Sequence, residues 1–559
     1  MRNVKDVLSC NPESEEVSPP STDFIRPIGG YEKLLSRKIP DSSSVALSHG
    51  AVYVLAGDID TSIFTKAIIL CVEKHPMLRS YIKINKDATE NPITGPELVW
   101  VDYAGDNQEI VDVAVTYLQE QDDTIELSWK REMERAMNGP QFPSLGPLWY
   151  LKVLITPRKS ALVFCVNHGL DDQQSLNILV SDTLSFYDCL LRDEKIHTTP
   201  IPFPPSVEAA VSPECPGVAT LDWSLFQIGN SASGSLKVPE RVTKDLTRID
   251  PVIRETQEFL NKKYSVDSRK TIVDYFQISE EKLKRIREIC KSRNLTITHF
   301  LSAIMIFVTD QVILGHKSMD EKLDRKLRLL LSVGLRTYGK GMGEKDWTRG
   351  TVACAGGALD FVVPLKGANF LETGELNSCI GPPQSFWRTA EFCRDTTKDL
   401  MKRGFVEESV RLFGIGMKYA DILKVVEIAA TSSSGLGREY SCGLSNVGVV
   451  TFPEPLLQSG NDTMQQLPRD EKAGMFARFN PFMEGLGSDV SKLSTRKRLK
   501  LVKAYYGTSH ARNGVVCQLS CQTINSQLFG CLQFPFPILT RVDAIHCRQK
   551  VEEIVDSIV

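Results

Sequence analysis

The sequence predicts an α/β protein built from two lobes. Apolar segments with the alternation of strands and the spacing of helix faces follow one another in both halves of the 559-residue chain. A stretch rich in proline and small polar residues separates the halves and is typical of a connector. We therefore expect a disordered tail over 1–23, an N-terminal lobe over 24–200, a connector over 201–269 and a C-terminal lobe over 270–559.

The N-terminal half begins with a strand–helix–strand unit. The first helix must end before Pro76, because proline disfavours a helical conformation in the residue before it. Leu176, Leu179 and Val180 recur at the spacing of one face of a later, longer helix. In order, we expect a strand over Ala51–Leu55, a helix from Asp60 or Thr61, strands over Leu78–Ile84, Trp149–Ile155 and Ala161–Val166, and a helix over about Gln173–Arg192.

The C-terminal half repeats this alternation. Ser279 is a favourable N-cap, and Glu280 and Glu281 complement the helix dipole in the first turn. Two apolar runs flank Asn525-Ser526-Gln527, which predicts a hairpin. The expected elements are a strand over Tyr275–Ile278, helices from Ser279 and from Thr296 or Thr298, a strand over Arg328–Leu335, hairpin strands Val515–Cys521 and Leu528–Phe534, and a closing helix over about Val542–Ile558.

The composition is that of a globular protein with a large core, since 42% of the residues are hydrophobic and 24% are charged. The formal net charge of −3 gives no concentrated basic surface, so we expect no nucleic-acid partner. No run of 18 apolar residues predicts a membrane-spanning helix, and the polar N-terminus lacks the apolar region of a signal peptide. The closing helix carries both signs of charge, which favours protein packing, with peripheral membrane contact as the alternative.

The 14 cysteines form no paired CxxC framework, and together with the lack of a signal peptide this favours a reducing environment. They are spread thinly, and several lie within apolar runs, where a free thiol behaves as a small hydrophobe. Cys517 and Cys521 are four residues apart, a spacing that fits no zinc pattern. We expect a cytoplasmic protein without a metal.

One segment, Ala161–Ser175, carries recognisable chemistry. An apolar strand delivers His168 into a short loop, and Asp172 follows four residues later where a helix begins. Histidine suits general-base catalysis because its ordinary pKa lies near neutral pH, and a structural histidine is the alternative. The spacing alone is weak evidence, since His316 and Asp320 repeat it within a charged, exposed-looking loop.

The His168–Asp172 segment resembles the HxxxD signature of the coenzyme A-dependent acyltransferase superfamily, which includes chloramphenicol acetyltransferase, plant BAHD enzymes and peptide-synthetase condensation domains. Other segments resemble the fungal alcohol O-acetyltransferase branch and occur in the same order. They are Arg26–Glu32 (R-x-hydrophobic-G-x-x-E), Lys74–Arg79 (hP-x-L-R), Leu331–Arg336 and Ser445–Gly448 (SN-x-G). The resemblance covers most of residues 24–559.

The resemblance implies two chloramphenicol acetyltransferase-like lobes with a channel between them. It makes His168 the general base, and Asp172 a structural residue that pairs with an arginine, for which Arg336 is the candidate. Ser445 and Asn446 would lie near the channel and position the acceptor or the oxyanion, with a structural turn as the alternative.

Two departures from the superfamily pattern affect this interpretation. Asn167 stands where many relatives have a second histidine, and Gln173 stands where they have glycine, which bears on activity and on the width of the channel. The alternatives are a catalytically silent scaffold, an amide-forming condensation domain acting on carrier-bound acyl groups, and a cysteine enzyme using Cys442.

We therefore expect an acyl-CoA-dependent O-acyltransferase that resembles alcohol acetyltransferases of secondary metabolism. Acyl-CoA, with acetyl-CoA favoured, would be the co-substrate, and a small lipophilic alcohol or amine would be the acceptor. A two-lobed chain can build its channel internally, so we expect a monomer.

Overall fold

The computed structural model describes residues 24–37, 47–86, 88, 95–139, 142–143, 146–211, 261–313, 326–336, 338, 350–364, 384–416, 421–431, 435–452 and 499–558. The predicted tail over 1–23 lies outside the described residues. So do His316 and most of the predicted connector over 201–269.

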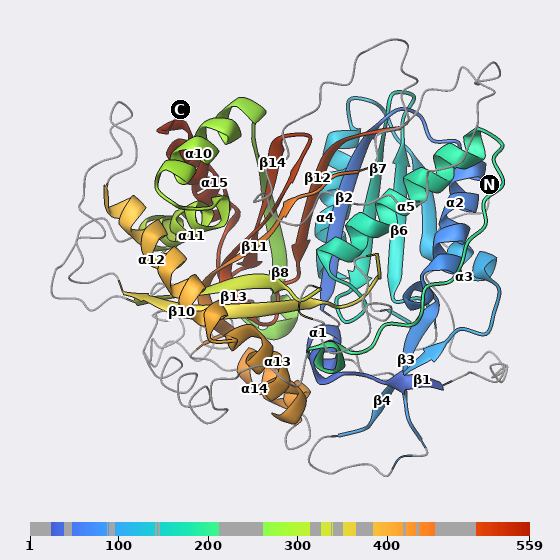
Figure 1. The fold of residues 1–559 in the computed structure, drawn as a ribbon, viewed down its shortest axis with the longest axis horizontal. Coiled ribbons are helices and arrows are strands. Elements are labelled where there is room, and N and C mark those ends of the chain that lie inside the picture. Colours follow the sequence, from blue (N-terminus) through green and yellow to red (C-terminus); the bar gives the residue numbers. More distant parts are fainter. Residues whose placement is uncertain are drawn as a thin grey trace.

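The N-terminal lobe is built on a five-stranded sheet. Its strands in spatial order are β12 (Lys500–Thr508), β2 (Ser48–Ala56), β7 (Lys159–Asn167), β6 (Trp149–Ile155) and β5 (Val115–Gln119). Neighbouring strands are antiparallel except β5 and β6, which are parallel. A smaller sheet with the order β1 (Phe24–Pro27), β4 (Leu98–Asp102) and β3 (Ser80–Ile84) lies below it in Figure 1.

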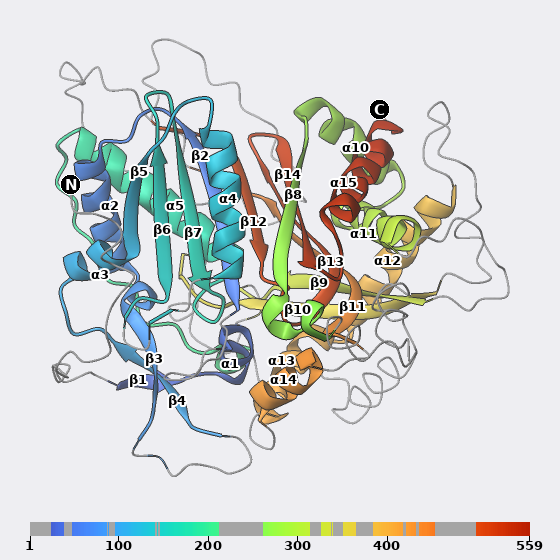
Figure 2. The same cartoon turned by 180° about the vertical axis from the view of Figure 1, so that it is seen from behind.

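Helices cover both faces of the five-stranded sheet. α2 (Thr61–Lys74) and α5 (Gln173–Leu191) pack together on one face, and α4 (Ile125–Asn138) covers the other (Figures 1 and 2). The Asp60 carboxylate caps α2 by accepting the backbone N–H groups of Ser62 and Ile63. Three shorter helices come from the same part of the sequence: α1 (Gly30–Ser36), α3 (Asn107–Ala114) and α6 (Val207–Ala210). Tyr31 of α1 and Val207 of α6 are buried in the core of the C-terminal lobe.

The C-terminal lobe is built on a six-stranded sheet. Its order is β10 (Gly356–Pro364), β9 (Lys326–Gly334), β11 (Arg438–Val449), β13 (Gly514–Ile524), β14 (Gln527–Phe536) and β8 (Lys270–Ile278). β11 runs parallel to both β9 and β13, and the other neighbours are antiparallel. The mixed sheet therefore joins segments that lie far apart in the sequence.

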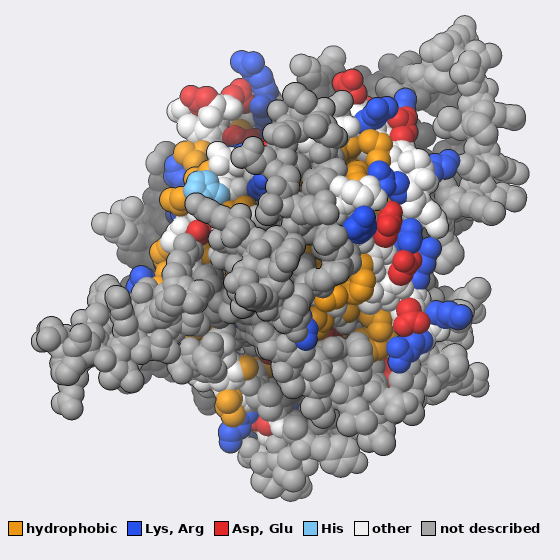
Figure 3. Space-filling model, turned by 90° about the vertical axis from the view of Figure 1, so that its left-hand side faces the viewer, with side chains coloured by type: hydrophobic (Ala, Val, Ile, Leu, Met, Phe, Trp, Pro, Cys, Tyr) orange, Lys and Arg blue, Asp and Glu red, His pale blue; other side chains and the backbone are white. Residues whose placement is uncertain are grey.

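Several helices lie on the side of this sheet away from the N-terminal lobe (Figures 1 and 2). They are α10 (Glu280–Ser292), α11 (Ile297–Val308) with the π-helical turn η5 (Thr309–Ile313), α12 (Gln384–Lys402) and α15 (Arg541–Asp556). α13 (Phe405–Gly416) and α14 (Ile422–Thr431) lie near α1, and the short turn η4 (Val266–Ser268) precedes β8. On the described part of the face in Figure 3, basic and acidic side chains are interspersed.

Most strands and helices predicted from local pattern are present within a few residues of their expected bounds. Ser279 caps α10 and Thr296 caps α11, as the sequence predicts. The predicted strand over Leu78–Ile84 is wrong at its start, because Pro76–Arg79 forms the 3-10 helix η2 and β3 begins at Ser80. Proline at the first position favours this turn, since its fixed φ suits a helical start.

The predicted division of the chain into 24–200 and 270–559 does not describe β12. This strand comes from the C-terminal part of the sequence but pairs antiparallel with β2, so it is an edge strand of the N-terminal sheet. Tyr505 on β12 is buried and stacks on Trp129 of α4, with ring centroids 5.5 Å apart. Non-local pairing of this kind has no signal in the local sequence.

In the described part of the chain, no single helix is long and apolar enough to cross a membrane. The pair Glu280–Ser292 and Ile297–Ile313 reaches that length and composition only across a bend of 100°.

Candidate functional site

His168 stands at the end of β7, the central strand of the N-terminal sheet. Its backbone N–H donates to the carbonyl oxygen of Leu47 at 2.9 Å. The next residue, Gly169, lies against α1: a Cβ there would come within 2.8 Å of the Glu32 carbonyl oxygen and 2.5 Å of the Ser36 Cβ. The hydrogen bond to Leu47 thus fixes the backbone of His168. Only glycine at position 169 allows α1 to approach this closely.

The ring of His168 is held in one orientation by its own loop. Nδ1 lies 3.0 Å from the carbonyl oxygen of Asp171. Because a carbonyl oxygen only accepts, the hydrogen bond requires the proton on Nδ1. In the neutral ring Nε2 is then unprotonated, and the side chain retains 18% exposure. This arrangement can take up a proton from a molecule that reaches the ring.

Asp172 is the N-cap of α5, and its side chain accepts hydrogen bonds from the first turn of that helix. Its Oδ1 accepts from the backbone N–H of Ser175 at 2.7 Å and from the Ser175 hydroxyl at 2.8 Å. Burial raises the pKa of Asp172, but the charge of Arg336 and the hydrogen bonds from Arg336 and Ser175 outweigh it. The net pKa of this carboxyl lies below its ordinary value, so Asp172 is ionised at neutral pH.

Arg336, which follows β9 in the C-terminal lobe, contacts the first turn of α5. Its Nη2 donates to Oδ1 of Asp172 at 2.8 Å, to the Ser175 hydroxyl at 2.7 Å and to the Ala353 carbonyl at 3.2 Å. The ion pair that we expected between Asp172 and Arg336 is therefore present. The backbone N–H of Ala353 also donates to the Ser175 hydroxyl at 3.0 Å, so α5 and the second lobe share one hydrogen-bonded joint.

A second histidine, which the sequence analysis missed, lies beside His168. His49 of β2 is 1% exposed, and the two ring centroids are 5.2 Å apart. Its Nδ1 lies 3.0 Å from the Oδ2 of Asp171, and its Nε2 lies 3.1 Å from the Oε1 of Gln173. The residues at the two positions next to Asp172, Asp171 and Gln173, are thus both bound to His49. The register of β2 on β7, which pairs Ser48 with Asn167 and His49 with Val166, brings His49 to this end of the strand.

Ser445 and Asn446 lie in strand β11 rather than in a turn: they pair with Ser520 and Cys521 of β13, and the pairing becomes irregular after Asn446. The Tyr506 hydroxyl donates to the Ser445 carbonyl oxygen at 2.7 Å. The Asn446 Nδ2 donates to Thr298 Oγ1 at 3.1 Å, and its Oδ1 accepts from the backbone N–H of Gly448 at 3.0 Å. Gly448 has φ of +85°, a conformation that favours glycine. These contacts give Ser445 and Asn446 a structural role that needs no substrate. A role of the two residues in positioning a substrate stays a prediction.

The geometry argues against two other chemistries at the described residues. His49, His168 and Asp171 carry ligand-type atoms within 4.8 Å of one another. However, both ring nitrogens of His49 face oxygen acceptors, so neither offers the free lone pair that a metal ligand needs. Burial raises the pKa of the Cys442 thiol to about 12, which leaves it protonated at neutral pH and unsuited to act as a thiolate nucleophile.

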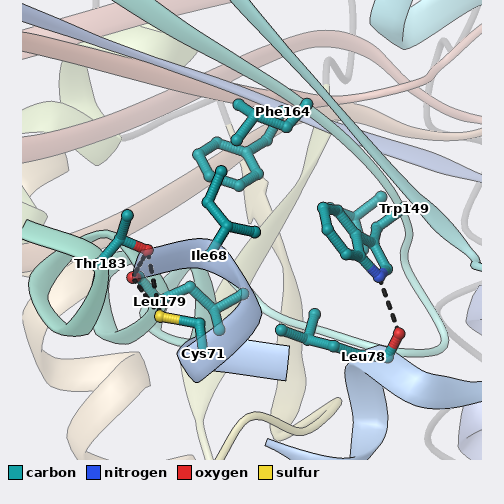
Figure 4. A pocket seen from close by; sticks show the side chains of 9 residues that line it. Ile68, Cys71, Leu78, Trp149, Phe164, Leu179 and Thr183 are labelled. Carbon is teal, nitrogen blue, oxygen red and sulfur yellow. Dashed lines mark hydrogen bonds between the residues drawn. The ribbon is translucent and has the colours of Figure 1, made fainter. Parts of the chain in front are cut away.

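A small cavity of about 20 Å³ lies inside the N-terminal lobe, between the sheet, α2 and α5. Figure 4 shows its apolar lining, where the Cys71 thiol meets the Thr183 hydroxyl at 3.2 Å and the Trp149 indole donates to the Leu78 carbonyl at 2.9 Å. Pockets for small molecules occupy about 300 Å³ or more, so this cavity belongs to the core rather than to a substrate site.

No protein-family model and no curated protein matches this sequence. Solved structures match the fold over nearly the whole chain. TRI3 trichothecene 15-O-acetyltransferase from Fusarium sporotrichioides is 10% identical with a TM-score of 0.63, over 98% of this chain and 100% of that chain. Polyketide synthase associated protein 5 from Mycobacterium tuberculosis is 13% identical with a TM-score of 0.54, over 95% and 99%. The condensation domain of the Monacolin K polyketide synthase MokA is 10% identical with a TM-score of 0.51, over 96% and 97%.

The chain has the two-lobed chloramphenicol acetyltransferase-like fold. The predicted fold class is confirmed by these structures and by the two mixed sheets. At 10–13% identity the likeness shows the fold alone, so the alcohol acetyltransferase branch stays a prediction.

Proposed function

We propose that this chain is an acyltransferase that moves an acetyl or other acyl group from acyl-CoA to the hydroxyl or amine of a small lipophilic acceptor, with His168 as general base. One observation carries the proposal: the Asp171 carbonyl holds Nδ1 of a partly exposed His168, which leaves Nε2 free to accept a proton. The likeness of the fold to an O-acetyltransferase supports the same class of reaction.

In the proposed reaction, the imidazole ring of His168 first accepts a proton and then returns it. Nε2 of His168 takes the proton of the acceptor hydroxyl as its oxygen attacks the carbonyl carbon of the thioester. The tetrahedral intermediate then collapses, the carbon–sulfur bond breaks, and the imidazolium returns the proton to the sulfur of coenzyme A. An ester and free coenzyme A leave, and the histidine is neutral again.

Asp172 and Arg336 act at a distance from the reacting atoms in this proposal. Their ion pair fixes the start of α5 to the second lobe and so holds the His168 loop at the junction. We further propose that the protein works as a cytoplasmic monomer on small molecules and needs no metal.

The first experiment follows coenzyme A release with a thiol reagent. Purified protein is given acetyl-CoA and longer acyl-CoAs against a panel of alcohols and amines, beside His168→Ala. We expect acceptor-dependent release that falls about a hundredfold or more in the variant, because the general base is lost. Circular dichroism checks that the variant is folded.

Equal release by both proteins would contradict the role of His168. Fold likeness to condensation domains favours one alternative, an amide-forming enzyme that takes acyl groups from a carrier protein. That enzyme would give no acceptor-dependent release from acyl-CoA but would acylate an amine from an acyl-carrier thioester.

A further inference from the structure

We propose that His49 is a positioning residue for His168: held as an imidazolium between Asp171 and Gln173, it neutralises the buried Asp171 carboxylate and keeps the Asp171 carbonyl directed at His168. The inference rests on the proposed function of His168 as the base. It concerns a residue that lies on another strand, more than a hundred positions away in the sequence, and outside the HxxxD segment.

The hydrogen bonds around His49 require protons on both of its nitrogens. Nδ1 faces a carboxylate oxygen of Asp171 at 3.0 Å, and Nε2 faces the side-chain oxygen of Gln173 at 3.1 Å. The orientation of the Gln173 amide is set by its other end, because its Nε2 donates to Asn177 Oδ1 at 3.1 Å and to the Tyr53 hydroxyl at 3.0 Å. Since both partners of His49 are acceptors, only a doubly protonated ring satisfies both contacts.

Charge balance leads to the same protonation state. Asp171 is fully buried, and a buried carboxylate is costly unless a cation and hydrogen bonds compensate it. Burial alone lowers the pKa of His49, but the charge and the hydrogen bond of Asp171 outweigh it and raise that pKa above its ordinary value. His49 and Asp171 therefore form a buried ion pair.

This ion pair touches the His168 ring from the side of Nδ1. The second oxygen of Asp171 lies 3.8 Å from Nδ1 of His168, and the carbonyl oxygen of the same residue accepts the hydrogen bond from it. Asp171 thus acts on His168 in two ways: its carboxylate places a negative charge near the ring, and its carbonyl oxygen fixes the tautomer. The contact with His49 restrains Asp171 for both purposes.

The other ionisable groups near His49 either favour its charged form or are neutral: the charge of Asp172 also raises the pKa of His49. Asp172 is already paired with Arg336. Burial and the charges of Arg438 and Arg37 lower the pKa of His510 to about 3, so that ring is neutral. Burial raises the pKa values of the Tyr53 and Tyr506 hydroxyls, which keeps both protonated.

Removing the charge of His49 should therefore appear in the pH dependence of the reaction. In His49→Gln the Asp171 carboxylate is left unpaired beside His168 and favours the imidazolium form of that ring. The acidic limb of the kcat/KM profile should then move up by about one pH unit. In the double variant His49→Gln/Asp171→Asn both charges are gone, so the limb should return towards its wild-type position.

The experiment measures kcat and KM from pH 5 to 9 for the wild type, His49→Gln and the double variant. We expect kcat of His49→Gln to fall about tenfold while KM changes little, because the base is mispositioned and binding is not. The matched control is His75→Gln. His75 is also 1% exposed and bound to a carboxylate, that of Asp182 at 2.7 Å, in the same lobe but in contact with neither His49 nor His168.

The proposal is supported if the acidic limb of the kcat/KM profile shifts in His49→Gln, returns in the double variant and does not shift in His75→Gln. Superimposable profiles for wild type and His49→Gln, or an equal shift in the double variant, would overturn it. A readout without turnover separates this from failure of the proposed function: the rate at which diethyl pyrocarbonate modifies His168, followed by mass spectrometry across the same pH range. The same shift of about one unit is expected there, and its absence in His49→Gln would again overturn the role of His49.

Discussion

The carboxylate of Asp172 connects the His168 loop to the second lobe through a single oxygen atom. Oδ1 accepts from Arg336 and from Ser175, and the side chain is 14% exposed. Replacing it in Asp172→Asn leaves the guanidinium of Arg336 without its counter-charge. Because loss of one partner of a buried pair is strongly destabilising, we expect a loss of about 3 kcal/mol at pH 7 and a lower kcat.

The pH dependence of this loss has a definite sign. The pKa of Asp172 is lowered on folding, so its stabilisation is present at neutral pH and is lost as the pH falls below about 4 towards the folded value. The thermal unfolding midpoints of wild type and Asp172→Asn should differ at pH 7, and the difference should be smaller at pH 3. Asp182→Asn is the control, since it removes another paired carboxylate of α5 away from His168. Asp182→Asn should lower stability without lowering kcat. If the unfolding midpoints of wild type and Asp172→Asn differ by the same amount at pH 7 and pH 3, the ionised Asp172 is not the source of the stabilisation.

The residues of the site differ in how far the sequence reveals them. His168 and Asp172 lie within one short segment, so strand, loop and helix start could be read together. The pairing with Arg336 came from resemblance and not from physical pattern. His49 could not be found this way: the predicted strand began at Ala51, because Ser48, His49 and Gly50 carry no apolar signal. Only the register of β2 on β7 brings His49 to His168.

At the scale of one element, the hairpin of β13 and β14 turns through two residues with left-handed backbone. Asn525 has φ of +48° and Ser526 has φ of +63°. Both are exposed, and a non-glycine residue in this region costs about 1–2 kcal/mol. Asparagine followed by glycine is the favoured pair for such a two-residue turn.

Ser526→Gly should therefore stabilise the protein by about 1 kcal/mol, seen as a higher midpoint of thermal or urea unfolding. Ser526→Ala is the matched control and should give no gain, because alanine keeps the Cβ that opposes a positive φ. Activity should be unchanged in both. A gain of equal size in Ser526→Ala would show that the backbone conformation is not the cause.

Elements of this kind are the part of the fold that local sequence predicts best. The hairpin, the caps of α2, α10 and α11, and the long helix α5 each depend on residues within a few positions. The start of β3 was missed because an apolar run after proline can form a 3-10 turn as readily as a strand. Which strands pair is decided by contacts across the whole chain.

At the scale of the molecule, the two lobes are interlaced. β12 hydrogen-bonds to β2 along Lys500–Thr508, opposite Ala56–His49. The same strand carries Tyr505, which packs against Trp129 of α4 and Tyr275 of β8, with ring centroids 5.5 and 5.0 Å apart. β2 holds His49, so the C-terminal sequence completes the sheet on which the candidate site is built.

We therefore expect that residues 1–269 alone do not form a stable lobe. Without β12 the edge of β2 and the rings around Trp129 would be open to water, and an exposed apolar edge strand favours aggregation. Size-exclusion chromatography and circular dichroism should show an aggregated or poorly folded 1–269 fragment. Adding residues 499–509 through a flexible linker should restore a soluble monomer. Adding the same segment with Ala504→Pro should not, because Ala504 lies opposite Tyr53 in the middle of the strand, where the fixed φ and missing N–H of proline disfavour strand pairing. A 1–269 fragment that unfolds cooperatively by itself would mean that the N-terminal lobe is independent of β12.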